Sequence, residues 1–288
     1  MSRFLMSLAA RFPLALLHAL GTLLGWAMYG ISPTYRRHLR ENLAAAGYGE
    51  DARMRRAAVA GAGRMLAELP AIWLRPRAEV TALVRHIDGR ELAEAARNAG
   101  RGIVFLTPHL GCFEIAAKIA AENFPITVLY RAPKLAWLQP LIENGRGQDN
   151  VRLARADVSG VRELVGALLR KEAVGILPDQ VPGEGEGEWV EFFGRPAYTM
   201  TLGARLAARP GSICLLAFGE RLPGGRGYVL HLRPLPAALP GESETRRMNR
   251  ALEALIRECP GQYLWGYNRY KHPKGAPELR PKGAPPLA

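Results

Sequence analysis

Through the middle of the chain, short runs of apolar residues alternate with amphipathic segments of helical length. The runs at 102–106, 126–130 and 173–177 hold five residues each without a charged side chain, which is typical of strands buried on both faces. Further strands are predicted at 151–154, 212–218 and 228–233, and helices at 113–123, 135–144 and 158–171. Strands that alternate with helices indicate βαβ units. The predicted fold class is therefore α/β, with a single mostly parallel central sheet flanked by helices.

The segments around this core are mainly helical. Residues 1–76 are rich in Ala, Leu and Arg, and we expect helices that end before Pro76, since proline disfavours helix continuation. The glycine-rich stretch 182–188 is expected to be a loop. The remaining predicted elements are a strand at 84–88, helices at 91–98, 198–208 and 244–259, and a disordered tail after residue 271.

Near the N-terminus, residues 12–31 run for twenty residues without a formally charged side chain. A helix of that length reaches about 30 Å, the thickness of the hydrocarbon core of a bilayer. His18 and three glycines dilute its apolar character. The segment therefore either spans a membrane, lies in the membrane interface or packs as a buried helix.

The charge of the chain favours a membrane partner. The formal net charge is +13 and the isoelectric point is about 10.1, which indicates an anionic partner such as nucleic acid, a membrane surface or a phosphorylated substrate. Arginines at 36, 37, 40, 53, 55, 56 and 64 follow the apolar segment. Basic residues beside an apolar segment mark the cytoplasmic side of a membrane. No RNA-type aromatic signature or zinc-finger spacing accompanies the charge, so we expect no nucleic acid.

These patterns divide the chain into four parts. Residues 1–35 form a membrane anchor or interfacial helix, 36–100 a basic helical region leading into the core, 101–272 the α/β domain and 273–288 the tail. The three cysteines are far apart and form no CxxC pair. A disulfide framework or structural zinc site is therefore not expected, and reducing, cytoplasmic surroundings fit best.

Candidate chemistry gathers where the predicted parallel strands end. His109 follows the strand at 102–106, Asp179 follows the strand at 173–177, and Glu114 begins the next helix. In open α/β sheets the crevice beyond the carboxyl ends of the strands binds ligands. A histidine there can act as a general base, and a nearby carboxylate can fix its tautomer. Because five residues of helix turn by about 500°, His109 and Glu114 can meet only if His109 lies in the loop before the helix.

Two arginines are expected near the same edge. Arg131 ends the strand at 126–130, and Arg146 follows the helix at 135–144. The planar guanidinium fork suits binding of phosphate or carboxylate groups. Taken alone, each of these residues is equally compatible with a structural or solvated role, and it is their convergence that indicates a site.

The order and spacing of these residues resemble the lysophospholipid/lipid A acyltransferase family, whose late acyltransferases add secondary acyl chains to the lipid A precursor. The resemblance covers residues 1–272. It rests on the HX4E box His109 to Glu114, the Tyr130-Arg131 strand end, Arg146, the Asp179-Gln180 pair, the Phe-Phe-Gly-Arg-Pro-Ala stretch at 192–197, and the C-terminal Tyr263-Leu264-Trp265 with Arg269-Tyr270-Lys271. The chain departs from the family at Ala132 and at 266–268, which leaves the acceptor open.

The resemblance implies the reaction and its residues. His109 would deprotonate an acceptor hydroxyl, whose oxygen attacks the thioester of an acyl-acyl carrier protein, while Glu114 orients His109. Arg146, with Arg131, would hold phosphate or the developing oxyanion, and Asp179 would position the acceptor or support the arginine. No metal or cofactor is expected. The partners would be the carrier-protein donor, an anionic glycolipid acceptor and an anionic membrane surface, at the cytoplasmic face of the cell inner membrane.

Several alternatives stay open. The acceptor is a lipid A precursor, another glycolipid or a lysophospholipid, and the donor chain length and oligomeric state are undetermined. Cys112 lies inside the box, so an acyl-enzyme on Cys112 is a further possibility. A metal-dependent hydrolase with His109, Glu114 and Asp179 as ligands would lack the usual HExxH spacing. A non-enzymatic basic membrane-binding protein would explain the charge but not the convergence of residues on one sheet edge.

Overall fold

A computed structural model describes residues 2–133, 139–147, 150–183 and 185–279 of the chain. Its N-terminal part is helical: α1 (Ser2–Ala10), α2 (Leu14–Ile31), α3 (Pro33–Ala45), α4 (Ala52–Leu74) and α5 (Arg77–Thr81). Ser32 and Asp51 begin α3 and α4 by accepting hydrogen bonds from backbone N–H groups with their side chains. These helices confirm the expected helical N-terminal region, divided into several segments.

The centre of the molecule is a seven-stranded sheet in the order β1-β9-β8-β2-β5-β3-β4. Strands β2, β3, β4, β5 and β8 run parallel, whereas β9 pairs antiparallel with β8 and parallel with β1. The predicted mostly parallel α/β sheet is confirmed. The strands are β1 (Val84–Asp88), β2 (Gly102–Leu106), β3 (Ile126–Tyr130), β4 (Val151–Arg155), β5 (Ala173–Ile176), β8 (Ser212–Arg221) and β9 (Tyr228–Pro234).

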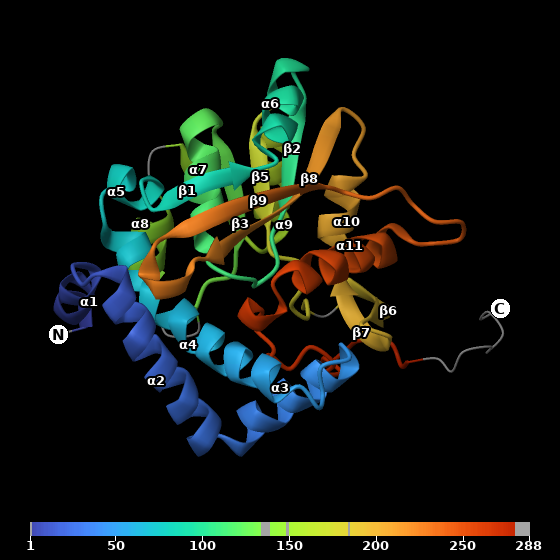
Figure 1. The fold of residues 1–288 in the computed structure, drawn as a ribbon. Coiled ribbons are helices and arrows are strands. Elements are labelled where there is room, and N and C mark those ends of the chain that lie inside the picture. Colours follow the sequence, from blue (N-terminus) through green and yellow to red (C-terminus); the bar gives the residue numbers. More distant parts are fainter. Residues whose placement is uncertain (1, 134–138, 148–149, 184, 280–288) are drawn as a thin grey trace.

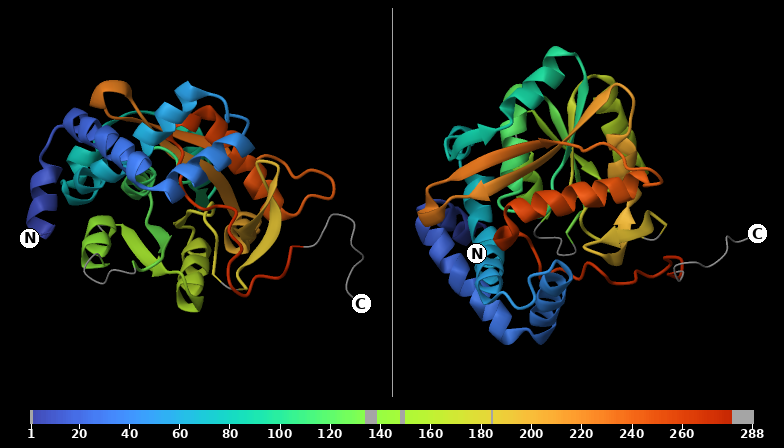
Figure 2. Two further views of the ribbon diagram at one scale, coloured as in Figure 1. Left: turned by 90° about the horizontal axis from the view of Figure 1, so that it is seen from below. Right: turned by 45° about the vertical axis from the view of Figure 1, so that its right-hand side comes forward.

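Helices cover both faces of this sheet (Figures 1 and 2). Side chains of β2 alternate between the two sides: Phe105 belongs to the hydrophobic core on the α7 side, and Leu106 to the core that includes residues of α9, α10 and α11. Burial on both faces explains why the strands are uninterrupted apolar runs. The remaining helices are α6 (Arg90–Asn98), α7 (Glu114–Asn123), α8 (Gln139–Arg146), α9 (Val158–Leu169), α10 (Thr201–Ala207) and α11 (Glu244–Glu258), with short 3-10 turns at Pro223–Gly225 and Pro260–Gln262.

A separate antiparallel hairpin, β6 (Gly187–Phe192) with β7 (Arg195–Met200), corrects one prediction. The helix expected at 198–208 begins only at Thr201, because the residues before it pair with β6. Phe193 and Gly194 both have positive φ and form the two-residue turn, the geometry that fits the twist of a hairpin. The first part of the tail that was expected to be disordered lies against this hairpin, since Trp189 Nε1 donates to the Pro277 carbonyl at 2.7 Å.

Two predicted boundaries reach beyond the described residues. The helix expected at 135–144 is described from Gln139 onward, and 134–138 lie outside the described residues, as do 280–288 of the tail. The sheet also extends into the region assigned to the basic helices, because β1 pairs with β9. The division of the chain at residues 35, 100 and 272 stays a prediction.

Candidate active site

His109 lies in a tightly fixed loop between β2 and α7. The Thr107 N–H donates to the Ile176 carbonyl at 2.9 Å, and the His109 carbonyl accepts from the Leu264 N–H at 3.0 Å. Gly111 has φ +59°, and a Cβ built there would lie 2.0 Å from the Gly219 carbonyl oxygen. Only glycine fits such a close approach at positive φ. The loop therefore presents His109 at the carboxyl end of the parallel strands, as predicted.

The side chain of Asp179 holds the His109 ring. The His109 backbone N–H donates to Asp179 Oδ2 at 2.9 Å, and ring atom Nδ1 lies 2.8 Å from Oδ1. Burial alone would raise the pKa of Asp179, but the charge and hydrogen bonds of His109, together with Arg269, lower it overall. An ionised carboxylate only accepts hydrogen bonds, so Nδ1 carries the proton. Nε2 is then the basic nitrogen, 3.2 Å from the Gln180 side-chain nitrogen.

Glu114 faces a different partner from the one expected. Arg146 Nε donates to its two carboxylate oxygens at 2.9 and 3.0 Å, and Arg146 Nη2 donates to it as well. Among the described residues, the carboxylate that is hydrogen-bonded to the His109 ring is that of Asp179. Glu114 makes no hydrogen bond to His109. The reason is direction: Glu114 begins α7 and points toward the end of α8, whereas Asp179 leaves the neighbouring strand β5.

A buried lysine fixes the end of α8 where Arg146 sits. Lys118 lies one helical turn after Glu114, and its Nζ donates to the Gly145 carbonyl at 3.0 Å. Burial lowers the pKa of Lys118 to about 8, against the opposing effect of Glu114. The Arg146 guanidinium also lies 5.7 Å from the centre of the Trp73 ring. Arg146 is therefore held by Glu114 and Trp73, and Lys118 fixes the neighbouring residue Gly145.

A cavity of about 270 Å³ opens beside His109. Its polar and charged lining includes His109, Glu114, Arg131, Arg146 and Gln180. Its walls are apolar and come from β2, β3, β5 and α7: Phe105, Ala116, Ala117, Ile126, Val128 and Ile176. A second cavity of about 240 Å³ shares Phe105 and Ala116 as a wall with the first. Four of the five predicted residues, His109, Glu114, Arg131 and Arg146, therefore line one cavity. The fifth, Asp179, is buried and contacts the His109 ring.

Beneath the loop lies a buried ion pair that sequence reasoning missed. Arg221 Nη2 donates to the Gly111 carbonyl at 2.6 Å and to Glu68 at 2.6 Å. Tyr228 and His18 donate to the same carboxylate at 2.9 and 3.0 Å. Burial raises the pKa of Glu68, but Arg221 and His18 lower it overall. Lone charges so far apart in the sequence give no local signal of such a pairing.

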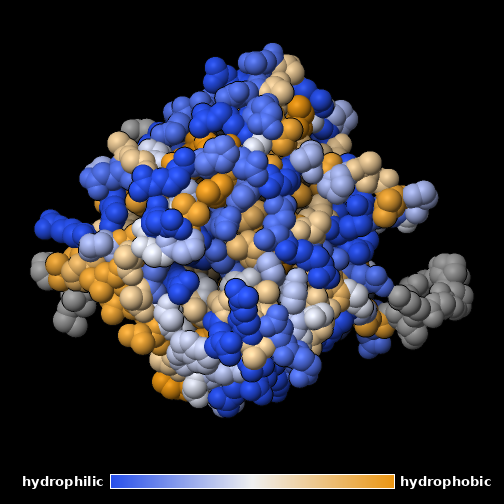
Figure 3. Space-filling model, viewed as in Figure 1, coloured by the Kyte–Doolittle hydropathy of each residue, from blue (hydrophilic) through white to orange (hydrophobic). Residues whose placement is uncertain are grey.

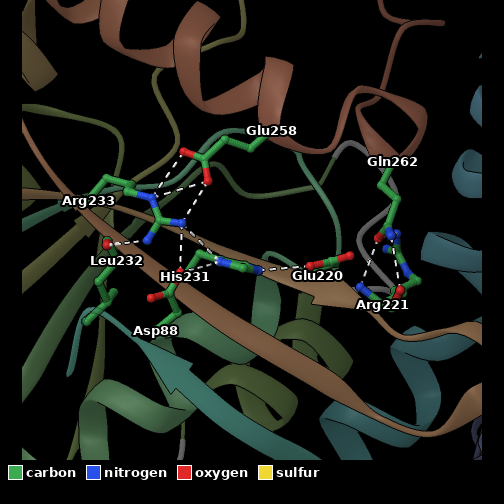
Figure 4. Close-up of polar contacts among 8 residues, drawn as sticks. All are labelled: Asp88, Glu220, Arg221, His231, Leu232, Arg233, Glu258 and Gln262. Atoms are coloured by element: carbon green, nitrogen blue, oxygen red, sulfur yellow. Dashed lines mark hydrogen bonds and ion pairs between the residues drawn. The ribbon is translucent and has the colours of Figure 1, made fainter.

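A second histidine, His231 on β9, provides a contrast to His109 (Figure 4). Its Nδ1 lies 3.1 Å from Asp88 Oδ2 and its Nε2 lies 2.9 Å from Glu220 Oε2. Arg233 joins the same group through Asp88 and Glu258. Both ring nitrogens of His231 thus face carboxylates, which leaves neither free to accept a proton from a substrate. Among the described histidines, His109 is the one that combines a carboxylate at one ring nitrogen with a cavity beside the ring.

The alternative chemistry on Cys112 is disfavoured by its surroundings. Cys112 is 1 % exposed, and burial together with Glu68 raises the pKa of its thiol well above the ordinary value. A thiolate is the reactive form of cysteine. Cys112 is absent from the cavity lining. Across the part of the chain that the structure describes, no three His, Cys, Asp or Glu side chains are grouped to hold a metal ion.

Comparisons with known proteins agree on one family. A model of the bacterial lipid A biosynthesis acyltransferases matches residues 2–272. The chain is 30% identical over 224 residues to a lipid A biosynthesis lauroyltransferase of Escherichia coli K12, which covers 75% of this chain and 71% of that protein. It is 26% identical over 215 residues to a lipid A biosynthesis palmitoleoyltransferase of the same organism, covering 73% and 68%, and equally to a lipid A biosynthesis acyltransferase of Shigella flexneri.

Proposed function

The chain belongs to the bacterial lipid A biosynthesis acyltransferases, and on that basis we propose that it moves a fatty acyl chain from an acyl-acyl carrier protein to a hydroxyl group of a lipid A precursor. The observation that carries the proposal is the hydrogen bond from His109 Nδ1 to the buried carboxylate of Asp179 at the rim of an apolar cavity. It is an acyltransferase with His109 as the general base.

The reaction is a direct transfer. His109 Nε2 takes the proton of the acceptor hydroxyl as the oxygen forms a bond with the thioester carbonyl carbon. The carbon–sulfur bond then breaks, and the imidazolium returns the proton to the departing thiolate of the carrier. Asp179 keeps Nδ1 protonated and stabilises the imidazolium between the two steps. The products are an ester and a free thiol, so atoms and electrons balance.

The two arginines handle negative charge. Arg146 stabilises a phosphate of the acceptor or the oxyanion that develops on the carbonyl oxygen. Glu114 supports the reaction through Arg146, whose guanidinium it orients by a two-oxygen contact. Arg131, at the rim, binds a phosphate of the acceptor.

The apolar walls of the cavity suit the acyl chain. The chain would enter past His109 and run between β2, β3 and α7 toward Phe105. Phe105 lies on β2, four residues before His109, and lines the same cavity. Phe105 and Ala116 then separate this cavity from the second one. The ring of Phe105 is therefore the end stop of the acyl site.

The charge of the protein suits both partners. A chain of net charge +13 attracts an acidic carrier protein and an anionic membrane, because encounter between opposite charges is accelerated. We place the protein at the cytoplasmic face of the inner membrane, where the arginines that follow α2 would lie.

The test uses purified full-length protein with His109→Ala. Mass spectrometry of the lipid product, with acyl-acyl carrier protein and a lipid A precursor as substrates, should show loss of transfer. His86→Ala is the matched control, because His86 is exposed on the edge strand β1. Transfer by His109→Ala at the wild-type rate would overturn the assignment. Lysophospholipid and other glycolipid acceptors, offered in parallel, identify the acceptor class.

A further inference from the structure

One face of helix α2 is buried against the rest of the protein. Its buried residues are Leu14, Leu17, His18, Gly21 and Gly25, which recur every three or four positions and form a single stripe. Figure 1 shows α2 running beside α4, and Gly21 and Gly25 of the stripe approach Gly63 and Val59 of α4. The two helices meet at this stripe over most of the length of α2.

The contact is made between backbones. A Cβ built on Gly63 of α4 would lie 1.9 Å from the Gly21 carbonyl oxygen, and one built on Gly25 would lie 2.2 Å from the Val59 carbonyl oxygen. Glycine on both helices is what allows this approach. Polar groups reinforce it, since Arg64 Nε donates to Thr22 Oγ1 at 2.9 Å. Helix α2 is therefore bound to α4 as part of the fold.

The opposite face of α2 is apolar and exposed. Leu23 is 67% exposed and Ile31 is 81% exposed, and Leu16, Leu20, Leu24 and Trp26 are each exposed by more than two fifths. Figure 3 shows hydrophobic residues gathered over α1 and α2 along one edge of the molecule. Soluble proteins rarely expose a continuous apolar band of this kind, which marks a surface that meets lipid or another apolar partner.

The ends of α2 carry groups suited to a lipid headgroup layer. Trp26 and Tyr29 pack edge to face at 5.7 Å, and both residue types favour the membrane interface. Arg36 donates to the Tyr29 carbonyl at 3.1 Å, and Arg40 donates to the Tyr29 hydroxyl at 3.0 Å. Arg11 is exposed before the helix begins. An apolar face framed by arginines complements an anionic lipid surface.

We propose that α2 lies in the plane of the membrane, with its apolar face in one leaflet, and does not cross the bilayer. The helix is apolar and long enough to be a candidate span by composition. However, a crossing α2 would take α4 with it, and α4 carries Arg53, Arg55, Arg56 and Arg64. An arginine at the bilayer centre costs about 2.5–3.5 kcal/mol even on insertion scales. This inference rests on the proposed membrane location but not on the chemistry of acyl transfer.

The first experiment reads the topology. Ser7→Cys and Thr34→Cys place an exposed thiol before and after α2. The wild-type protein serves as the control for labelling of the native cysteines. A membrane-impermeant maleimide should label both variants only after spheroplasts are permeabilised, because an in-plane helix keeps both ends on one side. Labelling of Ser7→Cys, but not of Thr34→Cys, in intact spheroplasts would overturn the proposal.

The second experiment reads the lipid-facing surface. Purified Leu23→Asp should bind vesicles of phosphatidylethanolamine and phosphatidylglycerol at least tenfold more weakly than wild type, and vesicles of phosphatidylcholine should bind wild type more weakly. Val158→Asp is the matched control, since Val158 is 69% exposed on α9, far from this surface in the sequence. Equal binding by the two variants would refute the proposal. Transfer to a detergent-solubilised acceptor should survive in Leu23→Asp, which separates this inference from the proposed reaction.

Discussion

Replacing Asp179 with asparagine would test the histidine–carboxylate pair with almost no change of shape. The wild-type carboxylate accepts two hydrogen bonds from His109, one from the backbone N–H and one from ring Nδ1. Asparagine has one oxygen and one NH₂ group. If its oxygen keeps the backbone hydrogen bond, its NH₂ faces Nδ1, and Nδ1 must then accept rather than donate. The proton moves to Nε2, which can no longer take a proton from the acceptor.

The expected loss is large because the wrong tautomer dominates. General base catalysis and its orienting carboxylate together contribute roughly 10²–10⁴-fold in comparable sites. That range corresponds to about 3–5 kcal/mol in the activation free energy. The loss should fall on kcat more than on KM, since Asp179 lies behind His109 and is 2 % exposed.

The assay is acyl transfer measured by mass spectrometry, with thermal unfolding recorded for each variant. Asp88→Asn is a matched control, because Asp88 also faces a histidine ring, that of His231, away from the cavity. Glu114→Gln should instead raise the KM for the anionic acceptor, since Glu114 acts on Arg146. A wild-type kcat in folded Asp179→Asn would refute the reasoning. A lower kcat with an unchanged KM in Glu114→Gln would place Arg146 at the oxyanion instead of at a phosphate of the acceptor.

Three further predictions concern the surroundings of the site. Phe105→Leu should shift donor preference toward longer acyl chains in a competition between carrier-bound donors, because less of the wall between the two cavities remains; unchanged preference would contradict the end stop. Glu68→Gln should lower the free energy of unfolding in denaturant titration by about 3–5 kcal/mol, since Arg221 is left buried without its counter-charge, whereas the exposed control Glu163→Gln should not. The pKa of Lys118 is lowered to about 8 from an ordinary 10.5. Between pH 8 and pH 10.5 the unfolded state therefore binds more protons than the folded state, and the free energy of unfolding of the wild type should rise with pH. This rise should be absent in Lys118→Met, and identical pH slopes for the two proteins would argue against a depressed pKa.

Much of the fold was predictable because the buried strands are recognisable in the sequence as short apolar runs. Strands β2 and β3 have the predicted bounds, since burial on both faces makes each an unbroken apolar run. The hairpin was missed because its second strand runs directly into α10: Met200 ends β7 and Thr201 begins the helix, with no turn residue between them. The turn at Phe193 and Gly194 depends on two positive φ angles. A phenylalanine in the sequence does not predict a positive φ angle.

The edge of the sheet at which the site lies was predictable, but the pairing within it was not. Parallel strands bring His109, Arg131 and Asp179 to one edge by topology alone. Which carboxylate meets the histidine depends on the direction of side chains from different elements, and proximity in sequence favoured Glu114 over Asp179. Arg221 and Glu68 could not be paired from sequence, since their contact joins β8 to α4 across the core.

The buried chain of contacts from His18 to the loop of His109 has a consequence for protein production. Deleting an apolar N-terminal segment is a common way to obtain a soluble form of a membrane enzyme. Here that deletion would remove His18 from Glu68, and Glu68 holds the arginine that binds the Gly111 carbonyl. It would also uncover the glycine surface of α4. A truncated protein would therefore suffer in folding and in the active-site loop, and detergent extraction of the full chain is the better route.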